Sequence, residues 1–211
     1  MARRMASEAF RGEQERDRYA PHVRAINEMV DDLRDLDGRG WMPYVAPWHG
    51  GVEARVLSVL RDPGPKTQDT IGSGFLCLEN DDPTAELQCR AFSEASIDPY
   101  DIAPWNAYPW YINRKPSASQ REAGVGPLLR LINLLPRLRV VLLQGGDARD
   151  TWLRLRTRHP ALVQGRKIEV VMTCHPGRQA LWSRDPAIRE ARAQHRRLAY
   201  RHVADALRHG A

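Results

Sequence analysis

The chain lacks the residues that build a metal site, a disulfide framework or a membrane span. Its 211 residues include three cysteines, and none of them belongs to a Cys-x-x-Cys pair. This count excludes a full disulfide framework and supplies no ligand set for zinc or an iron–sulfur cluster, so we expect no metal and no cofactor. No apolar run approaches the roughly 20 residues of a membrane span, and the N-terminus has early arginines without the apolar core of a secretory signal. We therefore expect a cytoplasmic protein without membrane contact.

The overall composition of the chain is that of a globular domain with a basic surface. Hydrophobic residues make up 42% and charged residues 27% of the chain, and the net charge is +6. Arginine supplies nearly all of the excess, which favours a polyanionic partner such as nucleic acid. The densest basic stretch is C-terminal and contains Arg184, Arg189, Arg192, Arg196, Arg197, Arg201 and Arg208. A solvated helix face would carry the same arginines, so both interpretations stay open for this stretch.

Short apolar runs alternate with helical patterns from residue 54 onward. The runs at 54–60, 138–144 and 167–173 are continuous, which is typical of strands buried on both faces, and a shorter strand is expected near 100–103. Helices are expected at 83–95, from 117 to about 135, at 147–157 and from 186 onward. This alternation predicts an α/β fold, a three-layer α/β/α sandwich around a central, mostly parallel four-stranded sheet.

Capping residues mark where several of these helices begin. Asp82-Pro83 and Asp185-Pro186 each combine an N-cap acid with a proline at the first helical position. Ser117-x-x-Gln120 and Ser119-x-x-Glu122 are both candidate capping boxes. The first 37 residues carry apolar positions at helical spacing, so we expect a helical extension (1–37) of a single domain (1–211), either one helix or a broken pair on the outside of the core.

Polar groups follow the predicted strands directly. Asp62 comes after the first strand, Asn106 after the second and His175 after the fourth, while Gly145-Gly146 ends the third. The carboxyl ends of parallel strands share one edge of the sheet, where ligands bind, so these groups should converge. Each also has a plainer interpretation, since turns and loops use the same residue types.

These side chains together suit cleavage of an N-glycosidic bond. A carboxylate orients a water and stabilises an oxocarbenium-like transition state, and an imidazole stabilises the negative charge on a leaving group. The asparagine amide suits the edge of a nucleobase, and the ring of Phe75 could stack on it. Together, these side chains would form a pocket for a flipped-out base, and the basic surface would contact the phosphates of the nucleic acid.

The motifs that carry these residues resemble those of the uracil-DNA glycosylase superfamily. Leu60-Arg61-Asp62-Pro63-Gly64 resembles its first motif, and His175-Pro176-Gly177-Arg178-Gln179 its last, a His-Pro followed by a loop that wedges into the duplex. PWNAYPWYINR and VVLLQGGDARDTW resemble the segments between them, and Phe75 has the spacing of the family's stacking aromatic. The likeness covers about residues 43 to 205 and is greatest to a bacterial branch without iron–sulfur cysteines.

The resemblance implies a role for each matching residue. Asp62 would position the attacking water and His175 would stabilise the anionic leaving base. Asn106 would read the Watson–Crick edge of that base while Phe75 stacks on it. The DNA contacts would come from Lys66, Arg178 and Gln179, the last two in the minor-groove wedge.

Two positions depart from the best-known members of that superfamily. Gly64 stands where they carry a tyrosine that blocks the 5-methyl group of thymine, so it leaves room beside the 5-position of the base. Leu60-Arg61 replaces a Gly-Gln pair, and Arg61 adds a donor for base or phosphate.

The leading hypothesis is a monomeric, monofunctional DNA glycosylase that releases uracil or a related damaged base and leaves an abasic site in repair. A second hypothesis keeps the chemistry and changes the substrate to a bulky 5-modified pyrimidine, such as glucosylated hydroxymethylcytosine, in phage defence. A third is a nucleic-acid-binding module without catalysis, and a fourth is an unrelated small-molecule hydrolase on the same sheet.

Overall fold

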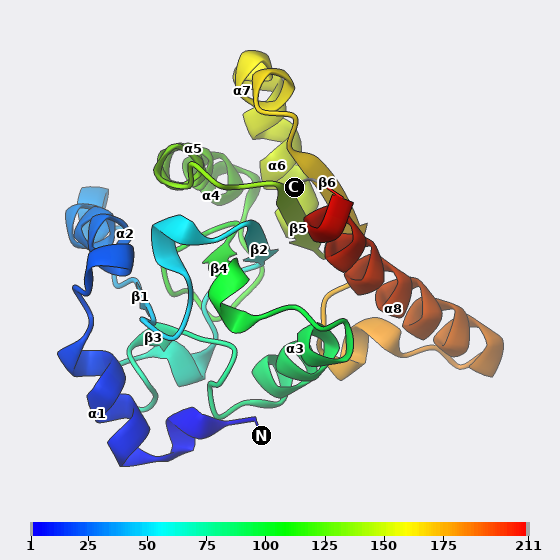
Figure 1. Ribbon diagram of the computed structural model, residues 1–211, viewed down its shortest axis with the longest axis horizontal. Helices are drawn as coiled ribbons and strands as arrows, with labels where there is room; N and C mark the ends of the chain where they lie inside the picture. The colour runs from blue at the N-terminus through cyan, green and yellow to red at the C-terminus, as the bar shows by residue number, and fades with distance from the viewer. Residues whose placement is uncertain (1, 210–211) are drawn as a thin grey trace.

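The central sheet of the protein consists of four parallel strands (Figure 1). The computed structural model describes residues 2–209, apart from the side chains of residues 163, 164 and 209, so the two ends of the predicted domain lie outside the described residues. The strands are β2 (Val56–Leu60), β4 (Ile102–Asn106), β5 (Val140–Gln144) and β6 (Glu169–Thr173). Their spatial order is β4-β2-β5-β6, and each neighbouring pair is parallel. The predicted α/β fold with a four-stranded, mostly parallel sheet is confirmed.

Helices cover both faces of this sheet and complete three layers. Alternate residues of each strand point to opposite faces. On β2, Leu57 and Val59 belong to the larger apolar core and Val56 to the smaller one. The larger core is covered by α2 (Pro21–Leu33), α4 (Ala118–Ala123), α5 (Val125–Leu134) and α6 (Gly146–Arg158), and the smaller one by α3 (Pro83–Glu94) and α8 (Pro186–His209). Helix α7 (Pro160–Gly165) follows α6.

Strand β4 is longer than the sequence predicted. It extends to Asn106, which pairs with Leu60 as the last residue of the strand, instead of ending near residue 103. Pro104 lies within this strand although proline cannot donate to a ladder. Since β4 is an edge strand, it needs donors on one side only, and the missing N–H is tolerated.

The segment predicted as one helix from 117 to about 135 is two helices. Ser117 forms the predicted capping box with Gln120 and begins α4, whereas the Ser119–Glu122 pair forms none. Helix α5 begins after Gly124, where a Cβ would lie 1.8 Å from the carbonyl oxygen of Ala107. Pro127 has no N–H for the carbonyl of Ala123, which prevents a continuous helix. Asp82 caps α3 as predicted, since its carboxylate accepts from the N–H groups of Thr84 and Ala85 at 2.8 and 3.0 Å.

The N-terminal residues form a broken pair of helices, α1 (Glu8–Arg16) and α2. Their apolar sides close the larger core, in which Phe10 and Ile26 are buried. Asn27 joins α2 to the short strand β1 (Tyr44–Val45) through two hydrogen bonds with Val45, and β1 pairs in parallel with β3 (Phe75–Leu76). None of the described helices combines the length and the apolarity needed to cross a membrane.

His49 is a fully buried histidine that connects three loops. The N–H of Leu78 donates to its Nε2 at 3.2 Å, so Nδ1 carries the ring proton and donates to the carbonyl of Pro99 at 3.1 Å. Burial lowers the pKa of His49 to about 4 from its usual 6.5. The folded protein therefore holds this ring neutral at pH values where the unfolded chain takes up a proton.

We expect acid to destabilise the fold through His49. Its contribution is fully present above the unfolded pKa of 6.5 and is lost as the pH falls from 6.5 towards about 4. Between pH 7 and 5 the free energy of unfolding should fall by about 2 kcal/mol from this group. Urea unfolding at both pH values should show a smaller pH effect in His49→Gln than in wild type or in His195→Gln, an exposed control. An unchanged pH effect in His49→Gln would contradict this expectation.

Candidate active site

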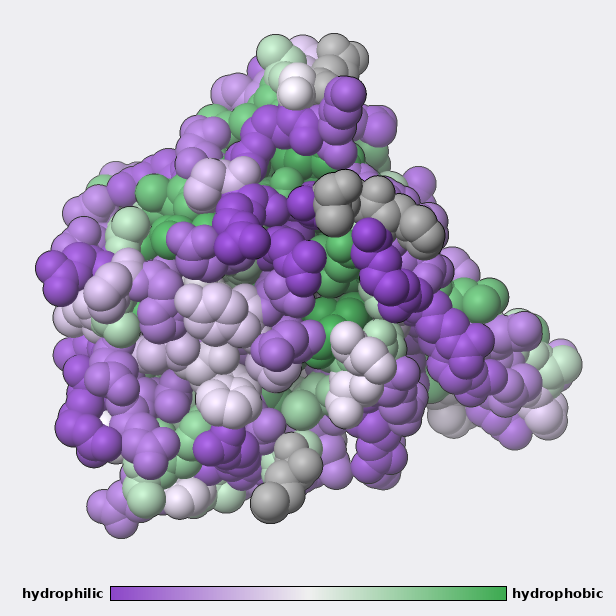
Figure 2. All heavy atoms as spheres, viewed as in Figure 1, coloured by the Kyte–Doolittle hydropathy of each residue, from purple (hydrophilic) through white to green (hydrophobic). Residues whose placement is uncertain are grey.

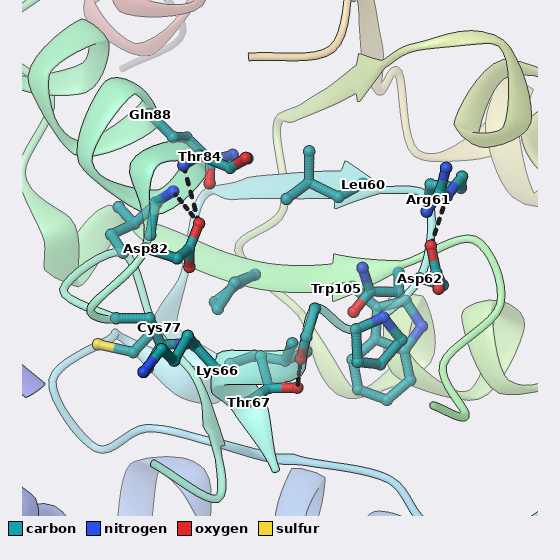
Figure 3. Close-up of a pocket in the computed structure, with 18 of the residues that line it drawn as sticks. Leu60, Arg61, Asp62, Lys66, Thr67, Cys77, Asp82, Thr84, Gln88 and Trp105 are labelled. Carbon is teal, nitrogen blue, oxygen red and sulfur yellow. Dashed lines mark hydrogen bonds and ion pairs between the residues drawn. The ribbon is translucent and has the colours of Figure 1, made fainter. Parts of the chain in front are cut away.

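A cavity of about 240 Å³ opens at the carboxyl ends of β2 and β4, next to the place where the strand order reverses. It is lined by Arg61, Asp62, Gly64, Lys66, Trp105, Asn106 and His175 among others. Figure 3 shows Arg61 and Asp62 at one end of it, with the Trp105 ring beside Asp62 and the first turns of α3 opposite. The predicted convergence of Asp62, Asn106 and His175 therefore occurs, although they come from three different strands.

Asp62 is a buried carboxylate with one oxygen paired and one free. Its side chain is 3% exposed, and Oδ1 accepts from Nε of Arg61 at 2.5 Å. Oδ2 is buried and has no hydrogen-bond partner among the described residues. The pKa of Asp62 is raised, mainly by burial and to a smaller extent by the negative charge of Asp147. The guanidinium of Arg61 and the backbone N–H of Arg114 lower it in part. A desolvated oxygen without a donor is costly, and a bound water or hydroxyl would satisfy it.

His175 presents a ring nitrogen that can donate into the cavity. The N–H of Gly177 donates to Nδ1 at 3.1 Å, so in the neutral ring the proton is on Nε2. Burial lowers the pKa of His175, the positive charge of Arg61 lowers it further, and Asp82 partly opposes them. Gly177 allows this tight turn, because a Cβ there would lie 3.0 Å from Nδ1. The group is thus a neutral N–H donor.

Asn106 and Trp105 place two more unpaired polar atoms at this edge of the sheet. Asn106 is 1% exposed and its Oδ1 has no partner among the described residues. The indole Nε1 of Trp105 is likewise buried and unpaired. With Oδ2 of Asp62, three polar atoms at one cavity lack partners, which is the pattern of a site that a ligand completes.

The structure does not bring Phe75 to this cavity. Its side chain is 1% exposed and packs in the core against Tyr44, with the ring centroids 6.2 Å apart. The pairing of β3 with β1 sets this orientation, and Leu76 and Cys77, which follow, line the cavity instead. The aromatic ring among the lining residues is that of Trp105, which the sequence reasoning did not select. In the sequence, the position of Trp105 next to Asn106 at the end of a predicted strand could have indicated that it lines the cavity.

The remaining predicted residues divide between the cavity and the surface. Gly64 and Lys66 line the cavity, Lys66 in a 3-10 turn at Pro65–Thr67. Arg178 and Gln179 begin a 3-10 turn at Arg178–Leu181 and are exposed outside the cavity. Gly145-Gly146 lines a neighbouring cavity of about 520 Å³, which shares His175. No group of three His, Cys, Asp or Glu side chains within residues 2–209 is placed to hold a metal ion.

Buried amides on the opposite wall were also missed from the sequence. Gln88 of α3 donates to Oγ of Ser58 on β2 at 2.9 Å, and Gln144 of β5 donates to the same oxygen at 2.9 Å. Asn80 is 2% exposed and holds the loop before α3 through the carbonyl of Phe75 at 2.8 Å. These hydrogen bonds fix the cavity wall relative to the sheet.

We expect His175 to titrate below pH 6.5 and to respond to Arg61. Removing the guanidinium in Arg61→Gln should raise the pKa of His175, since its positive charge disfavours the imidazolium. NMR titration of the imidazole Cε1–H signals, with His175→Asn to assign the resonance, measures both values. Arg130→Gln should leave the titration unchanged, because Arg130 pairs with Asp32 and does not line the cavity. A wild-type value at or above 6.5, or no response to Arg61→Gln, would refute the assigned electrostatics.

The chain matches no protein-family model and no curated protein.

Proposed function

We propose that the protein is a monomeric, monofunctional DNA glycosylase that hydrolyses the N-glycosidic bond of a flipped-out uracil or related base. The observation that carries this proposal is the meeting of Asp62, Asn106 and His175 on one cavity at the sheet edge. A carboxylate, a base-edge amide and a neutral N–H donor are the groups that this reaction requires. The cavity, at about 240 Å³, lies below the roughly 300–1,000 Å³ of pockets for drug-sized ligands and suits a single base.

In this reaction Asp62 acts on the water and on the sugar. Its unpaired Oδ2 accepts a hydrogen bond from a water and directs the water oxygen towards C1′. The negative charge stabilises the oxocarbenium-like transition state as the C1′–N bond breaks. Arg61 holds Oδ1 and favours the ionised form, in partial opposition to the burial that raises the pKa of Asp62. The water oxygen bonds to C1′ and keeps one of its protons as the new hydroxyl group. The other proton ends on the released base.

His175 and Asn106 act on the base. The Nε2–H of His175 donates to the base oxygen on which negative charge develops, and the neutral ring stays a donor across physiological pH. The Asn106 amide offers one acceptor and one donor, which complements the ring N–H and carbonyl of uracil. The Trp105 ring is as buried as that of Phe75 but lines the cavity, so in this proposal it contacts the base from the cavity wall.

A second candidate substrate is a pyrimidine with a bulky group at its 5-position. A Cβ built at Gly64 meets no atom within 4 Å, and the backbone there, with φ −79° and ψ 166°, accommodates any residue. Neither packing nor backbone conformation therefore requires glycine at this position. The open space beside the cavity is what favours this candidate.

Asp62→Asn keeps the size of the side chain and removes its charge, so base release should fall by about 10²–10⁴-fold, the range for a positioned acid or base. DNA affinity should stay within about twofold, since no phosphate contact is lost. Alkali-cleavable sites in a uracil-containing oligonucleotide measure release, and fluorescence anisotropy measures binding. Asp69→Asn, an exposed acid in the following loop, is the matched control. A variant as fast as wild type, or a wild-type protein that releases no base, would refute the proposed reaction.

Gly64→Tyr distinguishes the two substrate classes. The new ring should fill the space beside the 5-position and reduce release of glucosylated hydroxymethylcytosine by about 10–200-fold, the range for a misfit in a pocket. Uracil release should change far less, and Gly64→Ala should lie between. Labelled oligonucleotides carrying each base measure both rates. If wild type releases uracil and leaves the modified cytosine intact, the second candidate is wrong.

A further inference from the structure

A second concave surface of about 210 Å³ lies between α3 and α8. Arg90 of α3 forms one wall, and Arg196, Arg197 and Arg201 of α8 form the other. The remaining lining residues are Leu87, Ala91, Glu94, Ala95, Ala193 and Tyr200. We call this surface the arginine groove. Three of its residues are alanines, so a bound chain can approach the helix backbones closely.

The arginine groove carries more positive than negative charge. Arg90 has a long contact of 3.7 Å with Glu86, and Arg197 pairs with Glu190 at 2.6 Å. Arg201 is exposed and makes no ion pair with another described residue, although it lies one turn from Arg197. Like charges at this spacing destabilise a helix by a few tenths of a kcal/mol. Glu94 is the carboxylate among the lining residues, so the groove favours an anion.

The arginines elsewhere on α8 have partners within the chain, as Arg196 and Arg197 of the groove also do, but they do not line the groove. Arg189 donates to the carbonyl of Ser183 at 2.7 Å, and Arg192 donates to that of Trp182 at 2.6 Å. Arg208 pairs with Asp205. Figure 2 shows the hydrophilic surface that continues along α8 as it extends past the body of the protein. The basic C-terminal stretch is thus not a uniformly solvated face.

Both walls of the arginine groove also reach the candidate active site. The opposite side of α3 contributes Thr84, Ala85 and Gln88 to the active-site cavity. Arg196 donates to the carbonyl of Pro176 at 2.8 Å, next to His175. The loop that carries His175 is therefore anchored to one wall of the groove.

A buried hydrogen-bond chain joins the groove to the active-site wall. The Tyr200 hydroxyl donates to Oε1 of Gln144 at 2.6 Å, and Gln144 donates to Ser58 at 2.9 Å. Ser58 lines the active-site cavity and also accepts from Gln88. This chain of hydrogen bonds fixes the position of α8 relative to the cavity.

We propose that the arginine groove binds the phosphodiester backbone of the DNA that flanks the nucleotide held in the active site. The proposal rests on the proposed function in taking DNA as the partner. Guanidinium groups suit phosphate because their fork of donors matches two of its oxygens. Four of them on the two walls of one groove can contact successive phosphates of a polymer. The flipped base would occupy one cavity and the strand beyond it the other.

The test is the salt dependence of DNA binding by Arg90→Gln/Arg201→Gln. Neither residue lines the active-site cavity, and both side chains are exposed. Fluorescence anisotropy with an undamaged duplex should give a slope of log affinity against log salt that is smaller by about 1 per arginine. Binding at about 0.1 M salt should weaken roughly 2- to 30-fold, the equivalent of two exposed ion pairs. Arg90→Lys/Arg201→Lys should keep most of the slope.

Arg130→Gln/Arg137→Gln is the matched control. It also lowers the net charge from +6 to +4 by removing two arginines, but these pair with Asp32 and Glu53 away from the groove. Its slope should match that of wild type, and circular dichroism should show all variants folded. Equal losses in both double variants, an unchanged slope in the groove variant, or no salt-dependent DNA binding by wild type would overturn the inference.

This assay needs no base release, so it separates the two proposals. A protein that binds DNA through the groove and releases no base would keep this inference and refute the glycosylase. If the protein releases uracil and the groove variant binds DNA as wild type does, the glycosylase proposal stands and this inference is refuted. An acidic protein partner in place of DNA would leave the slope unchanged and so overturn the inference.

Discussion

The parallel pairing of β2 with both β4 and β5 is the constraint on which the rest of the structure depends. It places Leu60 opposite Asn106 and aligns the strand ends at one edge of the sheet. The polar side chain within this apolar strand, Ser58, accepts hydrogen bonds from Gln88 and Gln144 and so ties α3 and β5 to it. Such satisfied buried polar groups specify one arrangement of the layers, because any other would leave them unpaired.

Burial and one cation together set the electrostatics of the candidate site. Arg61 stabilises the ionised form of Asp62 and disfavours the ionised form of His175, so the two groups are pushed towards the states that glycosidic hydrolysis uses. Burial acts on both in the direction of neutrality, and at the carboxylate the ion pair at 2.5 Å opposes it only in part, so the pKa of Asp62 stays raised. The Arg61 side chain is itself 42% exposed, so solvent and substrate both have access to its remaining donors.

The layer formed by α3 and α8 links the candidate site to a basic surface. Only the C-terminal part of α8, around Tyr200 and Val203, is buried against the sheet, whereas its first turns extend past it (Figure 1). The same helix therefore contributes to the core at one end and to a charged groove further along. The α3 helix does likewise, with Gln88 at the cavity and Arg90 at the groove. A strand of DNA that contacted both surfaces would cross these two helices.

The sequence by itself determined the sheet, the cap of α3 at Asp82 and the residues at the strand ends, because burial on both faces and helix capping are local requirements. Tertiary structure alone decided that Phe75 packs away from the cavity while Trp105, which is equally buried, lines it. The pairing of β3 with β1 sets the direction of Phe75, and the pairing of β4 with β2 sets that of Trp105. Tertiary structure also decided which arginines of α8 converge with Arg90, since only the packing of two helices brings distant residues together. Local patterns specify elements, and the orientation of side chains between elements depends on contacts that no local pattern contains.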